Sequence, residues 1–266
     1  MEKKNQYALL TGGTSGIGYE LAKLFAADGY NLILVARTQE DLARVAAELM
    51  DAHDVDVRTI AKDLFYPGNA IELTDEITEM GIEISILVND AGQGQYGPFI
   101  DNDINRQLDI IHLNIESLVI LTHFYLKEMV GKASGRILNL ASIASKTPGP
   151  FQAVYHATKA FVHSFTEAIR SEVKETGVTV TSLLPGATDT DFFNKAEMLD
   201  AKNVQEGDLA DPAKVAKDGY EALMEGKDMV VSGFKNKVTV AMSNVLPDSA
   251  VADQVKKQQA PAEHGK

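Results

Sequence analysis

The chain has 266 residues, of which 45% are hydrophobic, and it contains no cysteine. This composition allows a large core and excludes disulfides, iron–sulfur clusters and cysteine nucleophiles. The formal net charge of −13 disfavours nucleic acid and anionic membranes as main partners. No stretch reaches the roughly 18 apolar residues of a membrane span, and the first residues lack a secretory pattern, so we expect a soluble cytoplasmic protein.

Seven short apolar segments recur along the chain and predict strands. Most are continuously apolar, which is typical of strands buried on both faces of a parallel sheet. They cover residues 7–13, 31–37, 55–64, 84–92, 135–142, 178–186 and 228–233. Amphipathic patterns separate them, as in 38–50, where Thr38 can cap a helix and Asp41 lies three positions later.

This alternation predicts right-handed βαβ units in an α/β fold: a Rossmann-type, doubly wound, mainly parallel seven-stranded sheet with helices on both faces. Without an internal repeat or a linker, residues 1–247 are expected to form one domain. The polar residues 248–266 are expected to be a flexible tail. Residues 235–247 are more apolar than a tail and suggest an extra helix. Its three alternative roles are to cover the pocket, to form a subunit interface or to pack on its own subunit.

A glycine-rich loop, "TGGTSGIG" at residues 11–18, follows the first strand and opens the first helix. Gly12, Gly16 and Gly18 permit a tight turn and a close approach of the backbone to a ligand, and the helix N-terminus offers N–H donors to a phosphate. The spacing is the wider T-G-x-x-x-G-x-G variant of the dinucleotide fingerprint. An ordinary glycine-rich turn is the alternative, but the strand–loop–helix context favours phosphate binding.

The end of the second strand bears on the type of cofactor. A free ribose 2′-hydroxyl usually meets an acidic group at this position, whereas a 2′-phosphate needs a cation. Ala36 supplies no carboxylate and Arg37 can pair with phosphate, which favours NADP over NAD. A solvated loop cation is the alternative, and the nearby Glu40 and Asp41 weaken the NADP interpretation.

Two segments, "YELAK" at 19–23 and "YHATK" at 155–159, each place a tyrosine and a lysine on one face of a helix. At 100° per residue, the first pair projects away from the apolar side of its helix and resembles a solvated surface pair. The second pair lies at the border of a broad apolar face, which can face a cleft against the sheet. Ser142, thirteen residues before Tyr155, follows the fifth strand, so the second pair is the catalytic candidate.

Taken in order, these motifs resemble those of the single-domain short-chain dehydrogenases/reductases over roughly residues 5–235. The matching motifs are "TGGTSGIG", "NDAG" (89–92), Asn114, Ser142, "YHATK" and "PG" (185–186). The resemblance implies a nicotinamide cofactor and a catalytic tetrad of Asn114, Ser142, Tyr155 and Lys159. One departure is Asp90, which replaces an asparagine of the family's "NNAG" and leaves the hydrogen bonding around Asn89 open.

The resemblance also implies which residues bind the cofactor. Asp63 and Leu64 would meet the adenine, Asn89 and Gly92 would hold the sheet and the cofactor, and residues 185–190 would border the nicotinamide. The full predicted set is Gly12, Thr14, Ser15, Gly16, Ile17, Gly18, Arg37, Asp63, Leu64, Asn89, Ala91, Gly92, Tyr155, Lys159, Pro185, Gly186, Thr188 and Thr190.

Hydride transfer to a carbonyl also requires a proton for the oxygen. A free tyrosine has a pKa of about 10, and the cation of Lys159, one turn from Tyr155, is expected to lower it. Ser142 is expected to hold the substrate oxygen, since ligands bind at the carboxyl ends of parallel strands. The resemblance implies that Lys159 also binds the nicotinamide ribose and that Asn114 admits a water that relays protons; a tolerated polar residue on a helix is the alternative for Asn114.

The sequence therefore predicts an NADP-dependent oxidoreductase that interconverts a carbonyl and an alcohol, with Tyr155 as general acid/base. The alternatives are a non-catalytic nucleotide sensor on the same fold and a nucleotide-sugar epimerase or dehydratase. Six histidines form no ligand pattern, so we expect no catalytic metal. Phe192 and Phe193 suggest a mostly apolar ketone or aldehyde as substrate, and the family implies a homodimer or homotetramer.

Overall fold

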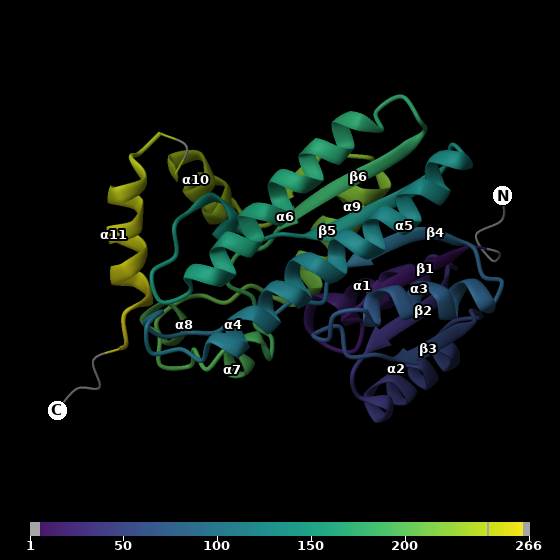
Figure 1. Ribbon diagram of the computed structural model, residues 1–266, viewed down its shortest axis with the longest axis horizontal. Helices are drawn as coiled ribbons and strands as arrows, with labels where there is room; N and C mark the ends of the chain where they lie inside the picture. Colours follow the sequence, from purple (N-terminus) through teal and green to yellow (C-terminus); the bar gives the residue numbers. More distant parts are fainter. Residues whose placement is uncertain (1–5, 244, 263–266) are drawn as a thin grey trace.

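The computed structural model describes residues 6–243 and 245–262, and its centre is a seven-stranded parallel sheet (Figure 1). The strand order is β3-β2-β1-β4-β5-β6-β7. The strands are β1 (Tyr7–Thr11), β2 (Asn31–Ala36), β3 (Val57–Ala61), β4 (Ile84–Asn89), β5 (Gly135–Leu140), β6 (Val178–Leu184) and β7 (Met229–Val231). Each lies inside one of the seven predicted segments, and the predicted Rossmann-type fold is confirmed.

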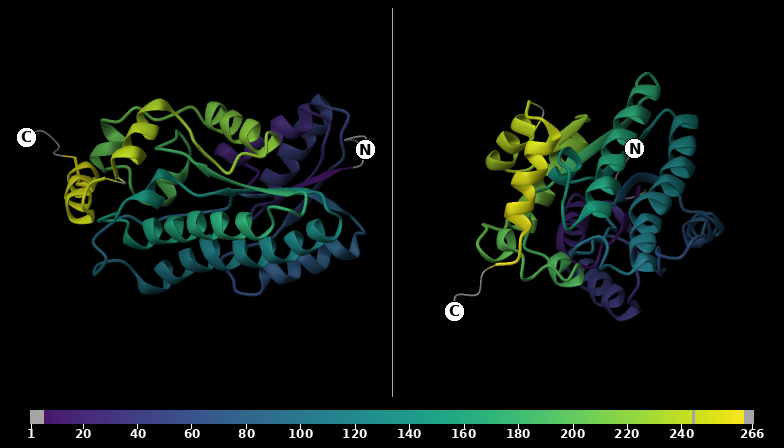
Figure 2. Two further views of the ribbon diagram at one scale, coloured as in Figure 1. Left: turned by 90° about the horizontal axis from the view of Figure 1, so that it is seen from above. Right: turned by 60° about the vertical axis from the view of Figure 1, so that its left-hand side comes forward.

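Helices cover both faces of the sheet (Figure 2). One face carries α1 (Gly16–Ala27), α2 (Gln39–Ala52) and α9 (Pro212–Met224); the other carries α3 (Asn69–Glu79), α5 (Ser117–Gly131) and α6 (Ala153–Glu172). Adjacent side chains of a strand point to opposite faces. Leu10 accordingly packs in the core under α1, whereas Leu9 packs in the core under α5. This two-sided burial explains the continuous apolar runs in the sequence.

Two helices differ in detail from the expectation. Thr38 is the N-cap residue of α2, but its side chain makes no capping hydrogen bond. Helix α4 (Ile104–Ile111) continues through a π-helical turn, η2 (His112–Glu116), into α5. Asn114 therefore lies in a widened turn, and π-helical turns of this kind are frequent at functional sites.

Four short helices gather at the carboxyl ends of the strands, at the end of the molecule opposite the start of β1 (Figure 1). They are α7 (Phe192–Lys195), α8 (Lys202–Gln205), α10 (Phe234–Ser243) and α11 (Asp248–Gln259). Helix α10 packs on its own chain, because Val240 joins a buried cluster with residues of β6 and α6.

The polar segment expected to be a flexible tail is instead helical over most of its length. Residues Asp248–Gln259 form α11, and only Val251 and Gln259 of this helix are buried. A helix that is polar on most of its surface gives a weak periodic signal, which explains the difference. Residues 263–266 lie outside the described part of the chain, and the single domain over 1–247 stays a prediction.

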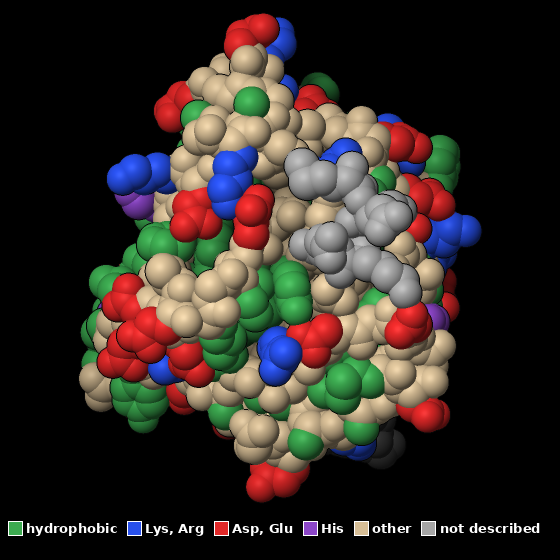
Figure 3. Space-filling model, turned by 90° about the vertical axis from the view of Figure 1, so that its right-hand side faces the viewer, with side chains coloured by type: hydrophobic (Ala, Val, Ile, Leu, Met, Phe, Trp, Pro, Cys, Tyr) green, Lys and Arg blue, Asp and Glu red, His purple; other side chains and the backbone are tan. Residues whose placement is uncertain are grey.

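Acidic side chains are spread over the end of the molecule where β1 begins, in keeping with the net charge of −13 (Figure 3). Among the described residues, no helix has the length and apolar character that a membrane crossing requires. Within residues 6–243 and 245–262, we find no group of three or more side chains that could hold a metal ion.

Candidate active site

A large cavity of about 550 Å³ lies at the carboxyl ends of the strands. It begins at the glycine-rich loop after β1 and extends past β4, where the strand order reverses. In open α/β sheets, ligands bind at this reversal point. The cavity continues to Tyr155 and to helix α11, so one space connects the predicted cofactor site with the predicted catalytic residues.

Most of the predicted site residues line this cavity. From the predicted cofactor set, the structure brings together Gly12, Thr14, Ser15, Gly16, Ile17, Arg37, Asp63, Leu64, Ala91, Gly92, Tyr155, Lys159, Pro185, Gly186, Thr188 and Thr190. Ser142 also lines it. Three predicted residues, Gly18, Asn89 and Asn114, lie behind the cavity wall instead.

The glycine loop is shaped by close contacts that exclude side chains. Gly12 and Gly16 have φ angles of 75° and 54°, in the region that favours glycine. A Cβ on Gly16 would lie 2.9 Å from the Thr190 side chain. A Cβ on Gly18 would overlap the Asp90 carboxyl and lie 2.5 Å from the Gly12 carbonyl oxygen. Gly18 therefore does not line the cavity. Its lack of a side chain lets Asp90 and Gly12 pack closely against the start of α1.

Asp90 is the main feature of the site that the family pattern did not supply. Its carboxyl is buried against the Gly18 backbone, which favours the charged form. Burial raises the pKa of Asp90 to about 7, and the nearby charge of Lys159 opposes that rise. The departure from "NNAG" therefore places a titratable group between the glycine loop and Lys159.

Asn89 holds the sheet and does not line the cavity. Its amide nitrogen donates to Asn139 Oδ1 of β5 at 2.8 Å and to Thr122 Oγ1 of α5 at 3.0 Å. The Asp90 backbone N–H donates to Thr11 Oγ1 at 3.2 Å. These bonds fix the end of β4 against β1 and β5, which answers the question that Asp90 raised about Asn89.

Tyr155, Lys159 and Ser142 meet at the centre of the cavity. Lys159 lies one helical turn from Tyr155 on α6, with Nζ 5.9 Å from the Tyr155 ring centroid and 2.7 Å from the Leu140 carbonyl oxygen, to which it donates. Ser142 lies two residues beyond β5, as the N-cap of η3 (Ile143–Lys146), and accepts from the Ala144 N–H at 3.1 Å. Ser142 lies with Tyr155 in the cavity lining, and its side chain favours the ionised form of the phenol.

The charge states differ from the expected ones. Burial raises the pKa of Tyr155 to about 12, and the neighbouring Ser142 side chain opposes this rise. Burial lowers the pKa of Lys159 to about 8, while the charge of Asp90 raises it. The expected lowering of the Tyr155 pKa by Lys159 is not found, because desolvation of the phenol dominates and the ammonium points at Leu140.

Asn114 contacts the backbone of the neighbouring loop. Its Oδ1 accepts from the Gln93 N–H at 2.9 Å, and its Nδ2 donates to the Gln93 carbonyl oxygen and to Thr158 Oγ1, both at 2.9 Å. Asn114 is fully buried and joins the loop after β4 to α6 beside Lys159. These partners could not be read from the sequence, since Gln93 carries no motif.

The far end of the cavity, beyond β2, is rich in cations. Arg37 is exposed and lies over the Phe65 ring at 5.4 Å. Arg44 and Lys62, neither of which belongs to the predicted set, line the same end. Arg44 pairs with Asp41 and Lys62 with glutamates of α3, whereas Arg37 forms no ion pair with a described residue.

The opposite end of the cavity is mostly apolar and closes around Tyr155. The Phe192 ring lies 5.1 Å from the Tyr155 ring, and Phe193 and Met198 extend this wall. Residues of α10 and α11 complete it, namely Thr239, Val255, Gln258 and Gln259. No local sequence signal marks these last residues, because tertiary contacts alone bring them here.

The other tyrosine–lysine pair lies outside the cavity. The Tyr19 hydroxyl donates to Glu48 of α2, and Lys23 forms an ion pair with Glu20 at 2.7 Å. Both side chains are half-buried between α1 and α2, so the pair is less solvated than expected. Position in the fold therefore separates the two motifs, as the sequence analysis predicted.

The strand order, the glycine loop at its reversal point and the cavity together define a dinucleotide-binding Rossmann protein. Comparison with known families makes this specific: the family model described as short chain dehydrogenase matches residues 6–199, and the chain belongs to this family. It is an oxidoreductase of the short-chain dehydrogenase/reductase class.

Individual relatives agree with this membership. An uncharacterized oxidoreductase of Staphylococcus saprophyticus is 32% identical over 213 residues, which cover 80% of this chain and 91% of the relative. A very-long-chain 3-oxoacyl-CoA reductase of Rattus norvegicus is 35% identical over 189 residues, 68% of this chain and 58% of the rat protein. A short-chain dehydrogenase from Sphingobium yanoikuyae, solved in complex with NADPH, has a TM-score of 0.80 at 26% identity and covers 94% of this chain and 99% of its own.

Proposed function

We propose that the protein is an NADP-dependent oxidoreductase that interconverts a ketone or aldehyde and an alcohol by hydride transfer. The observation that carries this proposal is the meeting of Ser142, Tyr155 and Lys159 in one cavity that continues to the glycine loop. Two hydroxyls on one side of an open space suit a carbonyl oxygen, which can accept a hydrogen bond from each.

The residues at the glycine loop fit a dinucleotide. Gly12 and Gly16 line the cavity with positive φ angles, so their backbone can lie close to a pyrophosphate there. Helix α1 begins at Gly16, and backbone N–H groups of its first turn can donate to the negative charge of the pyrophosphate. When bound, the nicotinamide supplies or accepts the hydride.

In the reducing direction, Tyr155 donates its proton to the carbonyl oxygen while Ser142 holds that oxygen by a hydrogen bond. A pKa of about 12 keeps Tyr155 protonated at neutral pH, as a proton donor must be. Lys159, one helical turn from Tyr155 on α6, binds the ribose. Asn114 fixes the Gln93 backbone beside this group and supports the proton relay that the family implies.

The preference for NADP over NAD rests on the charges beyond β2. Arg37 has no carboxylate partner among the described residues, and Arg44 and Lys62 line the same end of the cavity, so a 2′-phosphate would meet up to three cations. Kinetics with NADPH and NADH test this. Arg37→Ala should lower kcat/KM for NADPH about tenfold or more and leave that for NADH nearly unchanged. Equal losses with both cofactors would contradict the assignment.

The mostly apolar wall of Phe192, Phe193 and Met198 supports an apolar ketone or aldehyde as substrate. The activity is tested by following NADPH oxidation against a broad panel of carbonyl compounds. Turnover with charged sugars or phosphorylated compounds alone would contradict the apolar assignment. A nucleotide sensor is less well supported, since it has no need for Ser142, Tyr155 and Lys159 to meet in the cavity.

Assembly and location are further parts of the proposal. The family implies a homodimer or homotetramer, with contacts through helices at 101–130 and 151–175. Exposed apolar side chains on these helices, Leu108 of α4 and Phe161 of α6, support such an interface. Light scattering measures the oligomeric state directly. We also infer a cytoplasmic location, which fractionation of cells tests.

A further inference from the structure

Phe65 lies at the cation-rich end of the cavity and contacts two arginines. The Arg37 Cζ atom lies 5.4 Å from the centre of the Phe65 ring, and the Arg106 Cζ atom lies 5.0 Å from it. Both distances are within the roughly 6 Å at which a guanidinium is attracted to an aromatic ring. Phe65 and Arg37 line the cavity, whereas Arg106 does not. One aromatic side chain therefore connects a cation of the cavity with a cation behind its wall.

The backbone brings Arg37 and Phe65 together at the ends of two neighbouring strands. Ala36, the last residue of β2, pairs with Ala61, the last residue of β3. The Lys62 N–H then donates to the Ala36 carbonyl oxygen at 2.9 Å, so the pairing continues beyond the end of β3. Arg37 follows Ala36 directly and Phe65 comes three residues after Lys62, so the register of the two strands keeps these side chains near each other.

The Phe65 ring is held in place by its surroundings. It is buried and belongs to the same core cluster as Leu73 of α3. Its backbone N–H donates to Asp63 Oδ1 at 3.1 Å, and Asn69 Nδ2 donates to the Asp63 carbonyl oxygen at 2.8 Å. Arg37, in contrast, is exposed, and a free arginine side chain samples many rotamers. A fixed ring that attracts the guanidinium reduces this freedom.

Arg106 contacts the ring from α4 and is itself anchored. Its Nη2 donates to Gln93 Oε1. The backbone N–H and carbonyl oxygen of Gln93 are both bonded to the Asn114 side chain, at 2.9 Å each. The contacts therefore run without a break from Asn114 of the predicted tetrad, through Gln93 and Arg106, to Phe65. This anchor keeps the ring in position independently of Arg37.

The partner of Arg37 differs in kind from the partners of the other two cations at this end. Arg44 pairs with Asp41 at 3.6 Å, and Lys62 lies 3.4 Å from Glu72. A carboxylate neutralises the cation that it binds and occupies its N–H donors. An aromatic ring carries no net charge, so Arg37 keeps its full positive charge. Its N–H donors also stay available, and a guanidinium in this state can bind a phosphate with two parallel hydrogen bonds.

We propose that Phe65 is a positioning residue for the choice of cofactor, because it holds Arg37 in place to bind the 2′-phosphate of NADP. This inference rests on the proposed preference for NADP and deepens it: Phe65 acts through Arg37 and touches no phosphate itself. A guanidinium that is already ordered loses less rotamer entropy when the phosphate binds, which increases affinity. The increase applies only to a nucleotide with a 2′-phosphate, so it raises selectivity and not the general affinity for adenine nucleotides.

Binding of two small adenine nucleotides tests this role without any hydride transfer. We would titrate the full-length protein with adenosine 2′,5′-bisphosphate and with AMP in a calorimeter. The two ligands differ only in the 2′-phosphate, so any change in adenine binding cancels in the ratio of their dissociation constants. In Phe65→Leu the preference for the bisphosphate should fall about two- to fivefold, which is the change that an exposed cation–π contact corresponds to.

Further variants separate positioning from packing. Phe65→Met, a second replacement without an aromatic ring, should give the same fall, and Phe65→Tyr, which retains the ring, should keep most of the preference. In an Arg37→Ala background, Phe65→Leu should leave the ratio unchanged, because the ring acts through Arg37. Phe124→Leu is the matched control: Phe124 packs against the same core cluster but does not line the cavity, so the ratio should stay at the wild-type value.

An unchanged ratio in both Phe65→Leu and Phe65→Met would overturn the inference. An equal fall with and without the Arg37 side chain, or in Phe124→Leu, would also overturn it. Equal binding of the two nucleotides by the wild type would remove the proposed NADP preference itself, and the inference with it. A wild-type preference that Arg37→Ala removes and Phe65→Leu leaves intact would overturn the inference alone, so the two failures are distinguishable.

Discussion

The buried carboxyl of Asp90 packs against the Gly18 backbone, and this contact joins the first turn of α1 to the end of β4. The same carboxyl raises the pKa of Lys159 through its charge. One side chain therefore links the shape of the glycine loop to the charge of the lysine that we expect to bind the cofactor.

The substitution Asp90→Asn should shift the pH dependence of activity. It removes the charge that raises the Lys159 pKa, so Lys159 should lose its proton at a lower pH than in the wild type. The alkaline limb of kcat/KM for carbonyl reduction by NADPH should then move to lower pH. Asp75→Asn, on the exposed side of α3, is the control; an unchanged alkaline limb in Asp90→Asn would contradict the coupling.

Gly18→Ala should weaken both the fold and cofactor binding. The new Cβ would overlap the Asp90 carboxyl and press on the Gly12 carbonyl oxygen, and overpacking of this kind costs about 1–3 kcal/mol. Urea unfolding measures the loss, and NADPH titration should show a raised Kd. Gly131→Ala is the matched control, because a Cβ there meets no atom within 4 Å. A similar stability of both variants would refute this explanation.

Tyr155→Phe should reduce the turnover of carbonyl compounds by about 10²-fold or more, because positioned acid–base groups contribute 10²–10⁴-fold. The NADPH affinity should change little. Tyr19→Phe, the matched variant in the other motif, should retain full turnover and lose only about 1 kcal/mol of unfolding free energy with its Glu48 hydrogen bond. Wild-type turnover in Tyr155→Phe would rule out the proposed proton donor.

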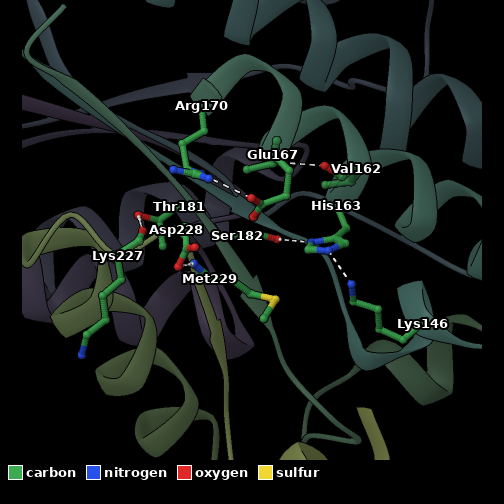
Figure 4. A network of polar contacts seen from close by, with 11 residues as sticks. Lys146, Val162, His163, Glu167, Arg170, Thr181, Ser182, Lys227, Asp228 and Met229 are labelled. Carbon is green, nitrogen blue, oxygen red and sulfur yellow. Dashed lines mark hydrogen bonds and ion pairs between the residues drawn. The ribbon is translucent and has the colours of Figure 1, made fainter. Parts of the chain in front are cut away.

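His163 should make the protein less stable in acid. It lies on α6 between Ser182 of β6, at 3.2 Å, and Lys146 of η3, at 2.6 Å (Figure 4). Burial and the Lys146 charge lower its pKa, so the unfolded chain binds a proton more readily than the native protein. The contribution of neutral His163 to the free energy of unfolding should therefore be complete above the unfolded pKa of about 6.5. It should decrease as the pH falls below that value.

Urea unfolding at a series of pH values measures this effect. Lys146→Met removes one cause of the lowered His163 pKa and should reduce the loss of stability in acid, and His163→Gln should reduce it further. Burial also lowers the pKa of His156, so this histidine likewise reduces stability in acid. A residual pH dependence should therefore remain in both variants. An identical pH dependence in the wild type and both variants would exclude His163 as its source.

The parts of the fold and site that the sequence predicted are those with local signals. Continuous apolar runs marked the strands because both faces are covered, and glycine spacing marked the loop because close contacts forbid a Cβ. The cations Arg44 and Lys62 lie on a helix and a strand end that look like ordinary solvated segments, so only the fold shows that they line the cavity. Gln259 was hidden for the same reason, in a segment whose polarity suggested a tail.

Helix α11 buries only Val251 and Gln259, whereas the central strands are buried along their length. Segments with few buried contacts open at a lower free energy than the core around them. The backbone amides of α11 should accordingly exchange with deuterium well before those of β1, without unfolding of the sheet. Because Val255, Gln258 and Gln259 of α11 line the cavity beside Tyr155, we expect such an opening to uncover it and to affect the rate of product release.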